Sequence, residues 1–442
     1  MSRILLGVGG GIAAYKAAEL LRRLTEPRPD AGETTDQAAA GTVQADTGET
    51  GPAATFRAGH DVTVVPTAAA LQFVGSATWE ALSGHAVHSG VFADVESVPH
   101  VRLGRAADLV VVAPATADLL ARAAAGRADD LLTSCLLTAT CPVVFAPAMH
   151  TEMWQHPATR ANVATLRSRG AVVIDPDSGR LTGADTGPGR LPDPDELAVI
   201  ARTILSRPEL AAPVAGRDLA GLRLVVSAGG TREAIDPVRF IGNASSGLMG
   251  QAIARAAALR GAQVELVAAN VDLPAPSGVR VHRVRSTIDL QQQMKKSGQQ
   301  ADVIVMAAAP ADFRPARAQV GKIKKTGDEG LQLSLVQNPD VLAGLVADRS
   351  EPGQVLVGFA AETADTPEQL LELGRHKLAR KGCDLLVLNA VGGGRVFGRT
   401  DSEIRLLKDV SADAAASPAW AGPKDVLAHH ILDAVQQIRS GR

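Results

Sequence analysis

The sequence predicts an α/β protein built from two tandem three-layer domains, each with a mainly parallel sheet between layers of helices. Short, uninterrupted apolar runs such as residues 109–113 and 303–306 are typical of strands that are buried on both faces. Many of these runs end in glycine, proline or small polar residues and lead into stretches with helical periodicity, the pattern of parallel β-loop-α units. The chain has 442 residues, more than one hydrophobic core usually supports, so we expect separate domains.

The composition excludes several classes of protein. A formal net charge of −2 gives no electrostatic argument for nucleic acid or an anionic membrane surface as a partner. No apolar run reaches membrane-spanning length, and the N-terminus enters a glycine-rich turn, so we expect a cytoplasmic protein. Cys135, Cys141 and Cys383 form no CxxC pair and no metal-ligand spacing, which indicates a reducing compartment without structural zinc.

The first predicted unit begins with a strand at residues 4–8, a tight turn at Gly9, Gly10 and Gly11, and a helix at residues 12–24. The turn fits the loose G-x-G-x-x-G/A fingerprint of dinucleotide-binding loops, so a nicotinamide cofactor is one alternative. A plain strand-to-helix turn would also explain the glycines.

The next predicted strand, residues 60–65, ends in Pro66 and Thr67 and lacks the Asp or Glu that would bind a ribose 2′-hydroxyl. Flavin mononucleotide (FMN) has a ribityl phosphate and no such ribose, so the Thr67 hydroxyl near a helix start suits FMN better. Residues 26–55, before this strand, are rich in Ala, Gly, Thr, Asp and Glu and should be a disordered insertion.

Two more predicted strands end in Ala-Pro. They lie within residues 109–120 (LVVVAPATADLL) and 142–149 (PVVFAPAM). Small residues and proline at repeated strand ends indicate loops that gather at one edge of a sheet, around a flat ligand.

These motifs resemble those of the cysteine decarboxylase flavoproteins. VGGGIAAYK, APATAD and PAMHTEMW are similar to the flavin- and substrate-binding motifs of that family, and PHVRLG is similar to its catalytic-histidine segment. The resemblance implies a flavodoxin-like domain in which His100 is the catalytic base and Met149 and His150 contact the substrate. On its own, His100 would more often be an ordinary exposed loop residue. The residues implied to bind FMN are Gly9, Gly10, Gly11, Thr67, Pro114, Ala115 and Thr116.

The sequence departs from this family at two positions. The substrate-binding motif normally has an asparagine where this chain has His150, which could donate a hydrogen bond or be a spectator. Residues 178–190 resemble the substrate flap, whose cysteine is proposed to reprotonate the intermediate, but Gly183 occupies that position. Either another group donates the proton, or the decarboxylase is slowed or lost, or the cysteine matters less than supposed.

A linker with high Pro and Ala content is predicted at residues 207–216, after a helix that begins at Pro194. It separates a first domain at residues 1–206 from a second at residues 217–442. The second begins with a buried strand at residues 224–226, followed by Ser227, Gly229, Gly230 and Thr231. Backbone N–H groups and hydroxyls at a strand's carboxyl end form a seat for an anion.

A second anion-binding turn follows in the same unit. The polar segment Asn243-Ala244-Ser245-Ser246-Gly247 should open a helix that ends at Gly261, with free N–H groups at its start. Two such turns in one β-loop-α-β unit suggest a ligand rich in phosphate. Asn243 alone would more often be a turn residue or helix cap.

Further polar groups follow later predicted strands. They are Asp312, the lysine run at residues 322–325, the segments 336–340 and 358–363, and Lys377 with Lys381. A short lysine run is usually only a solvated surface, and a phenylalanine such as Phe359 is more often a core residue. Downstream of an anion-binding sheet edge, the lysines could reach over a triphosphate.

SAGGTREAIDPVRFIGNASSGLMG resembles the ligase half of the bifunctional phosphopantothenoylcysteine decarboxylase and phosphopantothenate–cysteine ligase family of coenzyme A biosynthesis. The resemblance covers nearly the whole chain. It implies a Rossmann-like second domain that uses CTP to join cysteine to 4′-phosphopantothenate through an acyl-cytidylate, before decarboxylation to 4′-phosphopantetheine. Asn243 would bind the acyl-cytidylate, and Lys322 would act in amide formation. The residues implied to bind CTP are Gly229, Gly230, Asp312, Lys322, Asn338, Asp340, Phe359, Lys377 and Lys381.

The same resemblance implies a divalent ion, Mg²⁺ or Mn²⁺, whose ligands the sequence does not identify, and a homo-oligomer with ligase-domain dimers and a larger assembly through the flavin domain. The chain closes with a helix predicted at residues 425–438, with His429 and His430 on its partly exposed side and no ligand role. Three alternatives remain open: a ligase with a degenerate first domain, a nicotinamide oxidoreductase, and a non-enzymatic nucleotide sensor.

Overall fold

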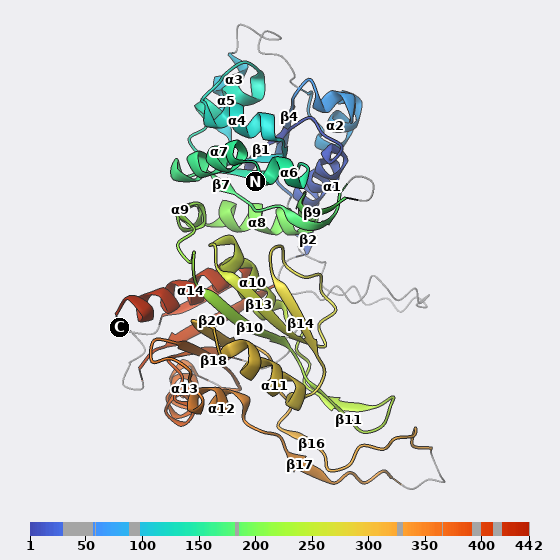
Figure 1. Cartoon of the computed structure of the whole chain (residues 1–442), viewed down its shortest axis with the longest axis vertical. Coiled ribbons are helices and arrows are strands. Elements are labelled where there is room, and N and C mark those ends of the chain that lie inside the picture. Colours follow the sequence, from blue (N-terminus) through green and yellow to red (C-terminus); the bar gives the residue numbers. More distant parts are fainter. Residues whose placement is uncertain are drawn as a thin grey trace, which may run out of the picture. The chain divides into compact units, whose positions relative to one another are not determined.

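The computed structural model describes residues 1–29, 56–57, 59–87, 98–181, 185–324, 330–364, 366–390, 399–409 and 418–441. The chain divides into two compact units, Met1–Asp218 and Leu219–Arg442 (Figure 1). Most of the insertion predicted at residues 26–55 lies outside the described residues, although β2 (Arg28–Pro29) pairs antiparallel with β3 (Phe56–Arg57) at its ends.

The sheet of the first unit contains β1 (Arg3–Val8), β4 (Asp61–Pro66), β5 (Leu109–Ala115), β6 (Val143–Pro147) and β7 (Val172–Val173). Its order is β4-β1-β5-β6-β7, and every neighbouring pair is parallel. Counted along the chain, this order is second, first, third, fourth and fifth, which is the flavodoxin-like arrangement. The order reverses between β1 and β5, and such a switch point is where doubly wound sheets bind ligands.

Helices cover this sheet in two layers. Side chains of α3 (Pro99–Ala106), α4 (Ala117–Ala124), α5 (Leu131–Thr138) and α7 (Pro157–Ser168) form one buried apolar cluster with Val110 and Val112 of β5. In the other layer, α1 (Ala14–Thr25) packs on α2 (Ser76–Ser83) and α8 (Pro194–Ser206). The amphipathic spacing of α1, with Ala17, Leu21 and Leu24 buried, is the helical pattern expected from the sequence.

The residues expected as a linker, 207–216, instead form η4 (Pro208–Leu210) and α9 (Ala211–Gly216) of the first unit. Leu210 and Val214 are buried there, and α9 packs on α7 and β7. The Pro and Ala content was therefore a poor guide, because alanine also suits a packed helix and proline its first turn.

The large sheet of the second unit contains β10 (Arg223–Gly229), β13 (Gln263–Ala269), β14 (Arg280–Val284), β15 (Val303–Met306), β18 (Val355–Glu362), β19 (Leu385–Ala390), β20 (Asp401–Leu407) and β21 (Ala419–Pro423). Its order is β14-β13-β10-β15-β18-β19-β20-β21, parallel from β14 to β19 and antiparallel beyond. The parallel part has the Rossmann order, with its switch point between β10 and β15.

Each face of this sheet has its own core. On one face, buried side chains of α10 (Leu248–Leu259) and α14 (Lys424–Ser440) pack with alternate residues of β10, including Leu224 and Val226. On the other, α11 (Thr287–Gly298), α12 (Val341–Ala347) and α13 (Pro367–Lys381) pack with Val225. Both units are thus three-layer α/β structures, and the predicted fold class is confirmed.

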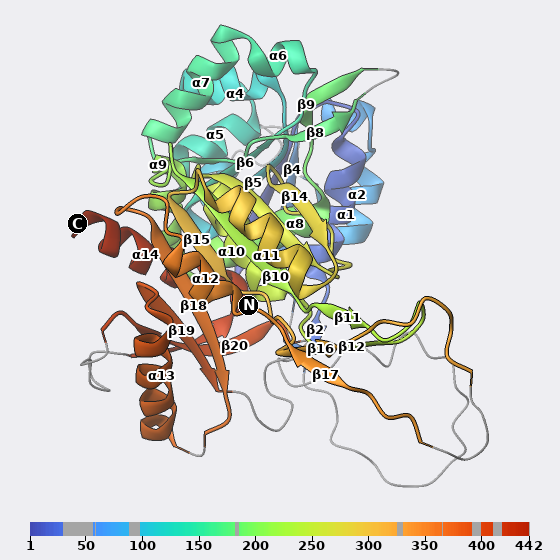
Figure 2. The same ribbon diagram turned by 60° about the horizontal axis from the view of Figure 1, so that its bottom comes forward.

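Short hairpins lie outside the large sheet. β11 (Arg232–Ala234) pairs with β12 (Phe240–Gly242), and β16 (Phe313–Pro315) pairs with β17 (Leu335–Gln337). β11 contacts β16, so the hairpins lie side by side, and Figure 2 shows them extending away from the sheet. We call these strands the arm. Its exposed apolar side chains include Phe240, Phe313, Leu335 and Val336.

The last helix corrects one expectation. His429 of α14 is only 2% exposed, not on a partly exposed side. The helical pattern alone could not predict this burial, because α14 packs against α10 as well as the sheet, and Arg260 after α10 donates to the His429 carbonyl. Within the described part of the chain, no helix is both long and apolar enough for a bilayer crossing.

Candidate functional site

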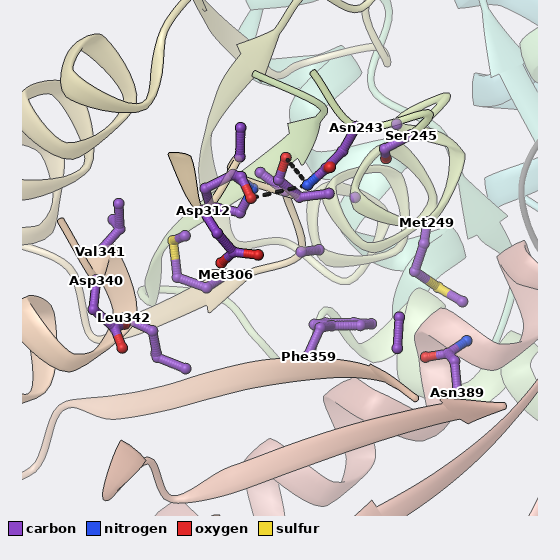
Figure 3. A pocket seen from close by; sticks show the side chains of 18 of the residues that line it. Asn243, Ser245, Met249, Met306, Asp312, Asp340, Val341, Leu342, Phe359 and Asn389 are labelled. Carbon is purple, nitrogen blue, oxygen red and sulfur yellow. Dashed lines mark hydrogen bonds between the residues drawn. The ribbon is translucent and has the colours of Figure 1, made fainter. Parts of the chain in front are cut away.

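A cavity of about 420 Å³ lies at the carboxyl edge of the second unit's sheet. It is lined by residues that follow β15 and β17, by the start of α10, and by side chains of β18 and α13 (Figure 3). This position includes the switch point between β10 and β15, where a Rossmann-like sheet binds its ligand.

The turn after β10 packs too closely for any side chain. A Cβ atom on Gly229, whose φ is +87°, would lie 2.1 Å from the Ala269 carbonyl oxygen. A Cβ on Gly230 would lie 2.3 Å from the carbonyl oxygen of Asn243. Neither glycine is among the residues that line the cavity, so their contribution is to let neighbouring segments approach.

Asn243 ties the two sides of the switch point together. Its Nδ2 donates to the carbonyl oxygens of Pro310 at 2.9 Å and Ala309 at 3.4 Å, as Figure 3 shows. The helix α10 then begins after Gly247, which has a φ of +80° and provides no side-chain cap. Free N–H groups and the positive end of the helix dipole therefore remain at the cavity for an anion.

Two of the lysines that line the cavity, Lys377 and Lys381, are each held by a carboxylate. Lys377 Nζ lies 2.8 Å from Glu362 Oε1, and Lys381 forms an ion pair with Asp340. Asp340 also caps α12, accepting from the Ala343 N–H at 3.1 Å. Burial opposes ionisation of Asp340, but hydrogen bonds from Lys381 and Ala343 hold its pKa below the ordinary value. The lysines are thus fixed before a ligand arrives.

Asn338 lines the cavity, yet its carboxamide is used within the protein. Nδ2 donates to the Ala311 carbonyl at 2.8 Å and to Thr287 Oγ1 at 3.3 Å, while Oδ1 accepts from Arg314 at 3.0 Å. The side chain therefore orients the turn that carries Asp312, whose own side chain is exposed at the cavity. Phe359 of β18 is half-buried and completes this part of the lining.

Of the residues predicted to act in the ligase, Asn243, Asp312, Asn338, Asp340, Phe359, Lys377 and Lys381 all line this cavity. Lys322 does not. It is exposed on the loop after β16, beside Ile323, which hydrogen-bonds to the turn between β11 and β12.

Ser245, from the second predicted anion-binding turn, also lines the cavity, as do residues that the sequence analysis did not assign to the site, among them Met249, Met306, Asn389 and Lys424. Lys424 begins α14 and is only 6% exposed, and burial lowers the pKa of its ammonium. The sequence did contain one signal for Lys424: a lysine at the start of a helix is unfavourable, because it lies beside the positive end of the helix dipole. The sequence contained no such signal for Asn389, because this residue lies near the end of an ordinary apolar strand.

In the first unit, the predicted flavin-binding residues meet at the switch point between β1 and β5. The Gly9 N–H donates to the Pro114 carbonyl oxygen at 3.0 Å. A Cβ on Gly9 would lie 2.4 Å from that oxygen, and one on Gly10 would lie 2.3 Å from Ala69 Cβ. Gly11 faces more open space, with Thr116 Cγ2 at 3.8 Å.

Hydroxyls at this edge organise the helix starts. Thr67 is buried, and its Oγ1 accepts from the Ala70 N–H at 3.2 Å. Thr116, which follows Ala115 at the end of β5, caps α4 by accepting from the Leu119 N–H at 3.2 Å. Exposed apolar side chains follow three strands at the same edge: Ile12 and Tyr15, Phe73, and Met153. This combination fits a flat aromatic ring system with a phosphate tail.

His100 is the second residue of α3, where its carbonyl accepts from Thr138 Oγ1 at 2.8 Å. Its ring Nδ1 is buried and has no hydrogen-bond partner among the described residues. A buried, unpaired imidazole nitrogen costs free energy unless a ligand satisfies it. This orphaned atom is the strongest structural sign of a ligand near His100.

Met149 and His150 lie under the hairpin of β8 (Asp177–Arg180) and β9 (Thr186–Arg190). The Met149 N–H donates to the Gly189 carbonyl at 2.9 Å, and His150 Nδ1 lies 3.9 Å from Asp185 Oδ2. Gly183, at the position where the family's flap has its cysteine, lies outside the described residues.

No cluster of three or more His, Cys, Asp or Glu side chains suited to a metal ion occurs among the residues the structure covers.

Comparison with known proteins gives the same division of the chain. Residues 54–205 match the family described as flavoprotein, and residues 219–438 match the DNA/pantothenate metabolism flavoprotein C-terminal domain. The coenzyme A biosynthesis bifunctional protein CoaBC of Mycolicibacterium smegmatis is 53% identical over 98% of this chain and 97% of its own. The protein of that name from Escherichia coli K12 is 40% identical over 88% of this chain and 86% of its own.

Among solved structures, the C-terminal domain of a CoaBC protein aligns with a TM-score of 0.41 and 30% identity, covering 51% of this chain and all of that one. The family indicated by the sequence motifs is confirmed by the two relatives, whose similarity spans nearly the full length of both partners. The chain therefore belongs to the CoaBC family of bifunctional coenzyme A biosynthesis enzymes.

Proposed function

We propose that the chain joins cysteine to 4′-phosphopantothenate with CTP in its second unit, and decarboxylates the product to 4′-phosphopantetheine with FMN in its first. One observation supports this most strongly. Residues from five separate segments, each of which the family motifs assign to the ligase, line one cavity at the switch point: Asn243, Asp312, Asp340, Phe359, Lys377 and Lys381.

The cavity suits activation of a carboxylate by a nucleotide. A carboxylate resists attack by an amine because it is anionic and lacks a leaving group, whereas a mixed anhydride with CMP does not. Forming that anhydride requires cations near the departing pyrophosphate, a role for Lys377 and Lys381. The N-terminus of α10 would supply N–H groups for a phosphate, and Asn243 at the same cavity would bind the acyl-cytidylate. Asp312, exposed at the cavity, could share an Mg²⁺ or Mn²⁺ ion with the phosphates.

Lys322 is assigned to the amide-forming step. An ammonium near the acyl carbon would stabilise negative charge as cysteine attacks. Lys322 lies outside the cavity lining, and the neighbouring Ile323 is hydrogen-bonded to the turn between β11 and β12, so this role requires a second copy of the chain to supply the lysine.

The first unit suits a flavin-dependent decarboxylase. The turn at Gly9 to Gly11, the Thr67 and Thr116 hydroxyls and the exposed apolar side chains would hold FMN, which when bound accepts and returns the substrate's hydride. Oxidation next to sulfur makes carbon dioxide easier to lose, since the remaining charge spreads onto sulfur. His100 has a buried nitrogen available to take the thiol proton, and Met149 and His150 would contact the substrate.

We also propose a homo-oligomer in the cytoplasm. The arm exposes Phe240, Phe313, Leu335 and Val336, a patch that a second copy would cover. The apolar side chains beside the flavin site support further contacts through the first unit. Cys135, Cys141 and Cys383 are free thiols, in keeping with a reducing compartment.

The test is a time course with the purified chain, CTP, Mg²⁺, cysteine and 4′-phosphopantothenate, with products weighed by mass spectrometry. We expect phosphopantothenoylcysteine to appear first and 4′-phosphopantetheine to follow, from a yellow protein with a flavin absorption band. Accumulated phosphopantothenoylcysteine alone would favour a ligase with a degenerate first unit, although full-length similarity to bifunctional relatives argues against that alternative.

The remaining alternatives give other outcomes in the same experiment. A nicotinamide oxidoreductase would be colourless and bind NAD. A nucleotide sensor would bind CTP without releasing pyrophosphate. Either result would overturn the proposed reactions.

A further inference from the structure

The Asp236 carboxylate in the turn between β11 and β12 is 1% exposed and fully engaged. Its Oδ1 accepts from the N–H groups of Val238 at 2.8 Å and Arg239 at 2.7 Å. Bonds of this kind, two and three residues along the chain, stabilise many ordinary turns. These two bonds use only Oδ1 of Asp236, so the turn does not explain the contacts of Oδ2.

The second oxygen reaches a segment distant in sequence. Asp236 Oδ2 accepts from the Ile323 N–H at 3.1 Å and from Arg239 Nη1 at 3.2 Å. The Arg239 Nη2 then donates to the Ile323 carbonyl at 3.3 Å. Both polar groups of the Ile323 backbone are therefore held by the same Asp-Arg pair. The Gln319 N–H adds a bond to the Ile235 carbonyl at 2.9 Å.

The residue before Ile323 is Lys322. The side chain of Lys322 is exposed. The hydrogen bonds from Asp236 and Arg239, which we call the anchor, hold the backbone of the next residue, Ile323. Burial works against the charge on Asp236, but the N–H groups of Arg239, Val238 and Ile323 hold its pKa below the ordinary value, so it stays ionised. The anchor is thus permanently charged at neutral pH.

We propose that Asp236 is a positioning residue for Lys322: together with Arg239 it grips the Ile323 peptide and fixes the loop from which Lys322 acts in amide formation. This inference rests on the proposed function, since it presumes a role for Lys322. It assigns residues 236–239 (DPVR) a task in amide formation. The turn itself needs only Oδ1 of Asp236.

Asp236→Asn separates the two tasks. Asparagine keeps an oxygen for the turn but turns an NH₂ group toward the Ile323 N–H and Arg239, which removes the grip. Asp236→Ser gives a second variant, because a serine hydroxyl can still form the turn but is too short to reach Ile323. Asp289→Asn is the matched control, since Asp289 is likewise a capping carboxylate in the same unit, and its side chain bonds to Ser286 at the start of α11.

Two rates are measured with the full chain. The first is pyrophosphate release with CTP, Mg²⁺ and 4′-phosphopantothenate but no cysteine. The second is amide formation when cysteine is added to the accumulated acyl-cytidylate. We expect both Asp236 variants to leave the first rate nearly unchanged and to slow the second by roughly 10- to 100-fold, as misplacement of a catalytic group does. Asp289→Asn should leave the ratio of the two rates unchanged.

A double-mutant cycle tests whether Asp236 works through Lys322. If it does, Lys322→Ala with Asp236→Asn should be no slower in amide formation than Lys322→Ala alone. Additive losses, or equal slowing of both half-reactions in the Asp236 variants, would overturn the inference. An unimpaired Lys322→Ala variant would instead refute the proposed role of Lys322, so the two failures are distinguishable.

Discussion

The carboxamide of Asn338 lines the cavity, but its hydrogen bonds are made within the protein. Nδ2 and Oδ1 are both bonded within the protein, to Ala311, Thr287 and Arg314. The sequence predicts Asn338 as a binding residue, but only the structure shows which partners its amide has. Its task is to hold the turn that leads to Asp312.

Asn338→Ala should therefore act through that turn. We expect a loss of about 1–3 kcal/mol in unfolding free energy, because the Ala311 carbonyl loses a buried donor. The KM for CTP should rise as Asp312 becomes less well held. Gln299→Ala, at an exposed position that does not line the cavity, is the control in urea unfolding and steady-state kinetics. Unchanged stability together with unchanged KM would contradict this role.

At the scale of single elements, the turn between β1 and α1 depends on the absence of side chains. Gly9→Ala would drive a Cβ to within 2.4 Å of the Pro114 carbonyl oxygen, which belongs to backbone and cannot swing away. We expect this variant to purify with little or no flavin absorbance. Gly75→Ala is the control, because nothing lies within 4 Å of its added Cβ. A Gly9→Ala protein as yellow as the wild type would show that this turn does not shape the flavin site.

The capping box of α5 gives a pH-dependent prediction. Asp130 caps the helix through the Thr133 N–H at 2.8 Å and pairs with Arg122 Nη1 at 2.7 Å. Burial opposes its ionisation, but the bonds from Arg122 and Thr133 hold the pKa of Asp130 below the ordinary value. Because the pKa of Asp130 is lower in the folded state, its ionised carboxylate stabilises the protein at pH values above the unfolded-state pKa of about 3.9. This stabilisation is lost as the pH falls through the folded-state pKa.

Asp130→Asn keeps the cap but removes the charge, so it should cost about 1 kcal/mol at pH 7. The difference from wild type should shrink as pH falls below the unfolded-state pKa of aspartate, and it should vanish once the wild-type carboxyl is protonated in the folded protein. Urea unfolding across this range measures it. Asp118→Asn is the comparison, since Asp118 pairs with the same Arg122 but is 75% exposed. A difference that stays constant with pH would exclude the charge as its cause.

The elements that sequence could predict are those with a strong local pattern. Buried strands such as β10 and β15 contain short apolar runs, and glycines mark the turns after β1 and β10. The segment 207–216 and His429 were misjudged because their burial depends on packing partners far along the chain. The pairing of Asn338 with Arg314 and the anchor between Asp236 and Ile323 are likewise long-range contacts, which a sequence alone does not reveal.

At the scale of the whole molecule, the arm should govern assembly of the second unit. Leu335→Glu would place a charge within the exposed apolar patch of the arm, so we expect a smaller oligomer by sedimentation velocity. Leu373→Glu on α13 is the control, because Leu373 is similarly exposed, at 42% against 44%, but lies away from the arm. Equal sedimentation of wild type and Leu335→Glu would exclude the arm as the interface.

The proposed ligase function depends on activation of a carboxylate by CTP in the cavity after β10 and β15. The most direct measurement weighs the species formed by the full chain with CTP, Mg²⁺ and 4′-phosphopantothenate before and after cysteine is added. We predict pyrophosphate and an acyl-cytidylate that cysteine converts to amide and CMP, with Asn243→Ala greatly impaired. Amide formed without any cytidylyl species, or an unimpaired Asn243→Ala variant, would contradict this function.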